Sequence, residues 1–125
     1  FRSSVLINKY SASDGDLFPW GFRALGLGKL IGTRTWGGIV GISGSLPYMD
    51  GTDIRVPFFT SFDPKTGSWI IENHGVDPDI LIDNDPVKEW NGEDQQLDRA
   101  IQEVMKELQD RKPLPGVPTP RDFSK

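Results

Sequence analysis

The chain has 125 residues and a mass of 14.0 kDa, which is enough for one domain with its own hydrophobic core. Its net charge of −4 argues against a nucleic-acid partner, because binding to a phosphate backbone depends on clustered Lys and Arg. With no Cys and one His, it lacks the residues for disulfide scaffolds, thiol nucleophiles and multi-His or Cys-based zinc sites. The sequence contains no run of about 18 apolar residues, so it predicts no membrane-spanning helix. It opens at Phe1 without an initiator Met or a signal-peptide pattern, which is typical of a piece of a longer protein.

The first part of the chain has the pattern of a strand, a tight turn and a helix. Residues 5–7 form a short apolar run with two β-branched members, which predicts a buried parallel strand. Residues 11–16 are rich in helix-capping types, and apolar side chains then recur at helical spacing at Phe18, Phe22 and Leu25. This order predicts that the chain turns sharply near residue 13 and enters a helix.

The end of this helix is marked by glycines. We expect Pro19 in the first helical turn, where proline is tolerated, and the end of the helix at Gly26 and Gly28.

Residues 30–31 predict a second short strand, parallel to the first. Glycines are dense from 32 to 44, which predicts a loop, because glycine permits positive φ and close backbone approach.

The middle of the chain has the pattern of β-hairpins. The dipeptide Asp50-Gly51 separates residues 45–48 from residues 54–59, which is a strong hairpin signal. A second turn, at 63–67, precedes an expected strand over 68–71. Residues 74–79 then turn into a further strand over 80–82.

The last part of the chain predicts one helix and a tail. An amphipathic helix is expected over residues 94–111, where apolar residues recur at Leu97, Ile101, Val104 and Leu108. Residues 112–125 carry four prolines and predict an extended tail. We therefore expect residues 1–111 to form one domain and residues 112–125 to lie outside it.

Ser13 is the first candidate for chemistry. A hydroxyl at a sharp turn between a strand and a helix is exposed for attack, and the amides of the helix point toward a developing oxyanion. The alternative is that Ser11, Ser13 and Asp14 only cap the helix. Composition alone favours capping.

Two further groups have plain alternatives. His74 is a candidate general base for Ser13, yet a lone His beside Gly in a turn is usually a solvated loop residue, and its neighbour Glu72 does not orient it by strand alternation. Four aspartates follow at Asp77, Asp79, Asp83 and Asp85. Prolines and the lack of an EF-hand pattern favour turns and strand flanks over a calcium site for this acidic run.

Four ordered blocks, taken together, carry a family resemblance. They are NKYSASDGD (8–16), LIGTRTWGG (30–38), DG (50–51) and IENHGVDPD (71–79). In order and spacing they resemble the tail-specific serine peptidase family, and within it the tricorn protease branch. The resemblance extends over nearly the whole chain to Arg111.

The resemblance implies roles for three residues. Ser13 is implied as the nucleophile that attacks the peptide carbonyl, and the backbone amide of Asp14 as one oxyanion donor. In the tricorn branch the base is a histidine preceded by a serine, and a glutamate on a late strand hydrogen-bonds that serine. Glu72 fits this glutamate.

The resemblance also implies what the chain lacks. Processing peptidases of the family use a lysine base, and its place falls at Gly38, which has no side chain to accept a proton. The histidine base, its neighbouring serine and the second oxyanion amide lie before the nucleophile in the family. His74 belongs to a different block, so we expect half of an active site and little activity from the chain alone.

The resemblance further implies an α/β fold with a crotonase-like (ClpP-like) core, represented by its C-terminal part, with β-hairpins and a C-terminal amphipathic helix. No metal or organic cofactor is implied, because serine, imidazole and carboxylate suffice for the reaction. The implied partners are peptide substrates, the remainder of the parent peptidase and further copies in a homo-oligomer. Tricorn relatives are mainly cytosolic, whereas processing members work outside the membrane.

Two alternatives to this function stay open at the level of sequence. One is a non-catalytic peptide-binding or assembly module of the same fold, in which the glycine-rich loop and the hairpins hold an extended peptide. The other is hydrolysis by Ser13 with His74 as base within this chain. That alternative requires the two side chains to lie about one hydrogen bond or one bridging water apart.

Overall fold

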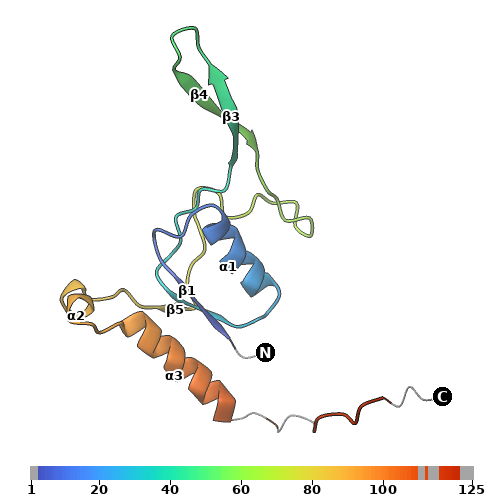
Figure 1. Ribbon diagram of the computed structural model, residues 1–125, viewed down its shortest axis with the longest axis vertical. Coiled ribbons are helices and arrows are strands. Elements are labelled where there is room, and N and C mark those ends of the chain that lie inside the picture. Colours follow the sequence, from blue (N-terminus) through green and yellow to red (C-terminus); the bar gives the residue numbers. More distant parts are fainter. Residues whose placement is uncertain (1–2, 110–111, 113–115, 122–125) are drawn as a thin grey trace.

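The computed structural model describes residues 3–109, 112 and 116–121, with residues 43–46 described by their backbone. It combines helices and strands (Figure 1). In chain order the elements are β1 (Ser4–Ile7), α1 (Asp14–Ala24), β2 (Lys29–Gly32), β3 (Gly41–Pro47), β4 (Asp53–Phe59), β5 (Ile80–Leu81), α2 (Pro86–Trp90) and α3 (Gln95–Gln109). No helix among these residues has the length and apolarity needed to cross a membrane.

Three short parallel strands form the central sheet, in the order β1-β2-β5. Ser4 of β1 pairs with Lys29 of β2, and Ile31 of β2 pairs with Ile80 of β5. The expected parallel pairing of the first two strands is therefore confirmed. Because the strands are parallel, the segments that follow Ile7, Gly32 and Leu81 all leave from the same edge of the sheet.

The sheet is covered on both faces. Ile7, Leu30 and Val76 pack with Phe22 of α1 in the buried core. On the other face, the Nζ of Lys29 lies 2.5 Å from Oε2 of Glu103 on α3. Adjacent residues of a strand point to opposite faces, so α1 and α3 cover opposite faces of the sheet.

α1 ends with recognisable capping geometry. At its C-terminus, Gly26 has φ +63°, the amide of Gly26 donates to the carbonyl of Arg23 at 2.9 Å, and the amide of Leu27 donates to the carbonyl of Phe22 at 3.1 Å. These bonds form a Schellman motif, which confirms the predicted stop. The expectation for Pro19 was wrong: α1 begins at Asp14, so Pro19 lies inside the helix, beyond its first turn.

β3 and β4 form the predicted antiparallel hairpin, and Gly51 in its turn has φ +81°. In Figure 1 the hairpin projects away from the central sheet and its helices. Every residue of β4 is exposed. The loop predicted over 32–44 is shorter than expected, because the backbone from Gly41 onward already pairs with β4, with irregular register near residues 41–45.

Two predicted strands are shorter than expected. The turn at 63–67 is present, but residues 68–71 form a single bridge, between Trp69 and Phe62, in place of a strand. β5 ends at Leu81 and does not include Ile82. In both places the apolar residues of the sequence pattern extend further than the backbone that pairs with a neighbouring strand.

The C-terminal part contains one helix that the sequence pattern did not predict. α2 is one turn long, and the side chain of Asp85 accepts hydrogen bonds from the amides of Val87 and Lys88 at its start. α3 lies within the range expected for the amphipathic helix, and the expected last two residues, 110–111, are outside the described residues. Of the expected tail, residues 112 and 116–121 have no regular structure, and residues 113–115 and 122–125 are also outside the described part.

Candidate functional site

Ser13 lies at the sharp turn that precedes α1. Its φ is +56°, a conformation that few residues other than glycine adopt, and its side chain is exposed. Asp14, the next residue, begins the helix, so the hydroxyl lies at the end where the helix dipole is positive. A position this open to solvent is compatible with attack on a substrate.

Ser13 and Glu72 line the same cavity, although they come from distant segments of the chain. The cavity has a volume of about 460 Å³. Apart from these two residues, its lining is apolar side chains and glycines: Trp36, Gly38, Val40, Gly41, Ile42 and Pro57. The fold therefore brings together the two side chains that the sequence singled out, in a mainly apolar surrounding.

Glu72 is half-buried and holds backbone amides. Its Oε2 accepts hydrogen bonds from the amides of Ile39 at 2.6 Å and Val40 at 3.0 Å. Its Oε1 accepts no hydrogen bond from the described residues. The late-strand position that the resemblance implied for this glutamate was wrong: Glu72 lies in a turn, and Asn73 beside it has φ +64°.

Asp16 is a site residue that the sequence analysis did not identify. Its side chain is fully buried. Its Oδ2 accepts from the amides of Ser13 at 2.9 Å and Gly38 at 3.2 Å, and its Oδ1 accepts from the amide of Gly37 at 2.7 Å. The signal in the sequence was its position three residues after Ser13, where a capping-box acid is expected.

The two carboxylates together hold the segment of residues 37–40. All four backbone amides of this segment donate to a carboxylate, the first two to Asp16 and the last two to Glu72. At Gly38, a Cβ would overlap the ring of Trp36. The segment therefore contributes a fixed backbone wall to the cavity, and Gly38 contributes no proton acceptor.

Asp14 contributes its backbone to the same end of α1. As the first residue of the helix it has no intrahelical acceptor for its N–H, and its amide donates no hydrogen bond within the described part of the chain. Its side chain is exposed. An amide of this kind, next to an exposed hydroxyl, is free to donate to an incoming oxygen.

His74 is not part of this cavity. Its Nε2 lies 2.9 Å from Oδ2 of Asp77, and both side chains are more than half exposed. The hydrogen bond with His74 lowers the pKa of the Asp77 carboxyl below its ordinary value of 3.8, and the nearby Arg34 lowers it further. The structure thus pairs the single histidine with an aspartate, and His74 is not among the residues that line the cavity with Ser13.

Three of the four aspartates of the acidic run have structural partners, Asp77 among them. Asp79 accepts from the amide of Leu30 at 2.7 Å and pairs with Arg23 at 3.0 Å, while Asp85 caps α2. Within the described ranges, no group of three His, Cys, Asp or Glu residues is arranged to hold a metal ion. These contacts fit the interpretation of the aspartates as residues of turns and strand flanks.

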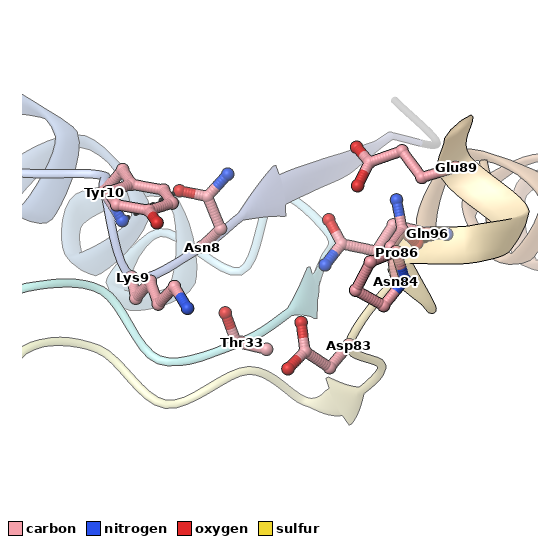
Figure 2. Close-up of a pocket in the computed structure, with 9 residues that line it drawn as sticks. All are labelled: Asn8, Lys9, Tyr10, Thr33, Asp83, Asn84, Pro86, Glu89 and Gln96. Atoms are coloured by element: carbon pink, nitrogen blue, oxygen red, sulfur yellow. Dashed lines mark hydrogen bonds between the residues drawn. The ribbon is translucent and has the colours of Figure 1, made fainter. Parts of the chain in front are cut away.

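A second cavity, of about 370 Å³, lies where the strands of the central sheet end. Its lining is polar and is drawn in Figure 2: Asn8, Lys9, Tyr10, Thr33, Asp83, Asn84, Pro86, Glu89 and Gln96. Figure 2 shows Lys9 on one side and Glu89 on the other, so the two ends carry opposite charge. This cavity contains neither Ser13 nor Glu72 and differs from the first in its polar character.

Comparison with known proteins identifies the family. The model of Peptidase family S41 matches residues 2–82 of the chain. The chain belongs to peptidase family S41. The predicted resemblance to this peptidase family and its tricorn branch is confirmed, since two proteins named tricorn protease are similar to more than four-fifths of the chain.

Relatives and a solved structure of the S41 family agree with this assignment. The tricorn protease of Thermoplasma acidophilum is 46% identical over 104 residues, 83% of this chain and 10% of that protein. A putative tricorn-like protease C-terminal subunit of Sulfurisphaera tokodaii is 42% identical over 107 residues, 86% of this chain and 12% of that protein. The crystal structure of the tricorn protease superimposes with a TM-score of 0.78 at 45% identity, over 86% of this chain and 10% of that one. The chain thus shares the fold of that region and spans about a tenth of the length of these relatives.

Proposed function

We propose that Ser13 is the nucleophile of a tricorn-like serine peptidase that hydrolyses peptides through an acyl-enzyme. The observation that carries this proposal is the position of Ser13: exposed, at a turn with φ +56°, at the N-terminus of α1, and in one cavity with Glu72. Membership of peptidase family S41 supports the reaction class. The apolar lining of the cavity supports a peptide substrate over a highly charged small molecule.

In the proposed reaction, Oγ of Ser13 forms a bond to the carbonyl carbon of the substrate while a base accepts the hydroxyl proton. The carbonyl oxygen becomes an oxyanion, to which the amide of Asp14 donates. The base then protonates the leaving amine as the peptide bond breaks, and water releases the acyl group by the reverse sequence. Glu72 supports the base through its Oε1, the oxygen that its contacts with Ile39 and Val40 leave unoccupied.

We propose that a histidine outside these 125 residues supplies the base, so that the chain alone has little activity. Gly38, at the place of the family's lysine, has no side chain, and His74 is paired with Asp77 away from the cavity. The relatives are about ten times longer than the matched region, which leaves room for such a contribution. On the family resemblance, we also propose that residues 1–111 are the C-terminal part of a crotonase-like catalytic domain in a cytoplasmic homo-oligomer.

One observation favours a second candidate, a peptide-binding module without catalysis. The hairpin carries the cavity residues Gly41, Ile42 and Pro57, and β4 is exposed along its whole length. An exposed strand beside a cavity can hold an extended peptide by strand addition. The two candidates differ in whether Ser13 reacts covalently.

The test is the Ser13→Ala variant of the full-length polypeptide that carries these residues, assayed with a panel of fluorogenic peptides. We expect hydrolysis to fall by at least about 10³-fold, because removal of a serine nucleophile removes the acyl-enzyme route. Ser11→Ala is the matched control: Ser11 belongs to the same turn, and among the described residues its Oγ accepts one hydrogen bond, from the amide of Asn8 at 3.2 Å. Hydrolysis that persists in the Ser13→Ala protein removes Ser13 from the role, and peptide binding without hydrolysis in the unaltered protein favours the module.

A further inference from the structure

The buried carboxylate of Asp16 connects the two walls of the Ser13 cavity. One wall is the turn that carries Ser13, and the other is the backbone at Gly37 and Gly38. The donors on the second wall are 21 and 22 residues away in sequence, so a single side chain joins two separate segments. We propose that Asp16 is the positioning residue that holds the Ser13 hydroxyl in its reactive place, an inference that rests on the proposed function of Ser13.

The backbone of Ser13 needs such a restraint. A residue with a Cβ at φ +56° is strained and relaxes toward negative φ unless its surroundings fix it. The Oδ2 of Asp16 accepts the amide of Ser13 itself, at 2.9 Å, and so acts directly on the strained residue. Relaxation of this turn would carry the hydroxyl away from its present direction.

The geometry requires a carboxylate at this position. Asp16 receives three N–H donors and presents two acceptor oxygens. An amide side chain of the same shape has one acceptor oxygen, and its NH₂ group would face at least one of these donors. Asparagine therefore keeps the volume of Asp16 but loses part of the connection between the two walls.

Burial limits Asp16 to positioning. Its side chain is fully buried and both oxygens are occupied, so it does not touch a substrate in the cavity. Its contact with the amide of Gly38 has a second effect, since that N–H is directed at a carboxylate and not at the cavity. The amide of Asp14 remains as the donor next to Ser13 within the described residues.

The experiment compares Asp16→Asn with unaltered full-length protein by the rate at which a fluorophosphonate probe labels Ser13. We expect the labelling rate and kcat to fall about 10- to 100-fold, because a displaced nucleophile loses the near-attack geometry, while KM changes little. Asp50→Asn is the control, since Asp50 also accepts a turn amide, that of Thr52 at 3.0 Å, but lies in the hairpin turn. A fall in kcat with little change in KM and with the melting temperature of the unaltered protein distinguishes positioning from loss of fold, because an unfolded fraction also lowers the apparent kcat without changing KM.

A second variant covers the case in which Asp16→Asn does not fold. Asp16→Glu keeps both oxygens and the charge but moves the carboxylate by one methylene, so we expect folded protein with slower labelling. Labelling of Asp16→Asn or Asp16→Glu at the unaltered rate overturns the positioning role, while Ser13→Ala still tests the nucleophile separately. If the unaltered protein is not labelled at Ser13, the proposed function fails, and this inference fails with it.

Discussion

Asp16 and Glu72 hold adjacent halves of one segment, residues 37–40, but in different surroundings. Asp16 is fully buried and both its oxygens accept backbone amides, whereas Glu72 is half-buried and uses only Oε2 within the described residues. A carboxylate whose two oxygens both accept backbone amides fixes the backbone, whereas one with an unoccupied oxygen can also accept a hydrogen bond from a further partner. Two acids with the same kind of partner therefore differ in what they can do, because they differ in burial and in the oxygen that remains unoccupied.

The largest effect is expected from breaking the segment that both carboxylates hold. In Gly37→Ala, the new Cβ would overlap the backbone nitrogen of Gly75 and lie 2.7 Å from the carbonyl carbon of His74. The φ of Gly37 is +86°, which an alanine rarely adopts. We expect a loss of about 3 kcal/mol or more in the free energy of unfolding, because backbone on both sides prevents relief. The measurement is urea unfolding of the full-length protein.

Gly51→Ala is the matched control for this prediction. Gly51 also has positive φ, +81°, but no atom lies within 4 Å of its added Cβ. Its cost should therefore be the backbone term alone, about 1 kcal/mol. Equal destabilisation by the two substitutions would show that residues 37–40 are not specially constrained.

The difference between the acids is sharpened by Glu72→Gln. The glutamine oxygen can still accept from the amides of Ile39 and Val40, so we expect the melting temperature to change little. Peptide hydrolysis should fall about 10²-fold, because the charge that supports the base is lost. Steady-state kinetics and a thermal melt of the same sample provide the check, and unchanged kcat would restrict Glu72 to holding backbone.

A neutral acceptor next to the same segment provides a reference for both acids. Thr35 is buried, and its Oγ1 accepts from the buried amide of Val76 at 2.7 Å. Thr35→Val leaves that amide without a partner, so we expect a loss of about 1–3 kcal/mol in the free energy of unfolding. Thr66→Val removes a 3.3 Å bond at an exposed turn and serves as the control. A similar small cost for both variants would contradict the role assigned to burial.

The smallest effect is expected at the exposed pair of His74 and Asp77. In the folded protein the pKa of Asp77 lies below its ordinary value of 3.8, chiefly because of the hydrogen bond with His74. The pairing therefore stabilises the fold above pH 3.8, and this stabilisation is lost as the pH falls through the lower pKa of the folded state. His74→Gln should reduce this acid dependence by about 0.5 kcal/mol, since both side chains are screened by solvent. Hydrolysis at neutral pH should stay within about twofold. A large loss of activity would restore His74 as a candidate base.

Local features of this fold were accessible from the sequence. The capping residues near Ser13, the helical spacing of Phe18 and Phe22, and the turn dipeptide at 50–51 act over a few residues, and the corresponding turn, helix and hairpin are present. The start of α1 was misplaced relative to Pro19, because the carboxylate of Asp16 caps the helix earlier than the apolar pattern begins. Propensity alone does not reveal such a contact.

Features that depend on distant contacts were not accessible. The partners of Asp16 include Gly37 and Gly38, and no local pattern connects these positions. The family resemblance implied a strand position for Glu72, but hydrogen bonds from the amides of His74 and Gly75 to the carbonyl of Ile71 close a turn there. The importance of Ser13 and Glu72 was inferred from a family resemblance, and the fold places both at one cavity.

The proposed function requires the hydroxyl of Ser13 to react covalently. The most direct measurement treats the full-length protein with a fluorophosphonate probe and locates the adduct by peptide mass mapping. The account predicts one adduct on the peptide that contains Ser13, absent from Ser13→Ala, with the melting temperature of that variant unchanged. An unmodified Ser13 in protein that hydrolyses peptides would contradict the account, as would an adduct on a different serine whose removal abolishes hydrolysis.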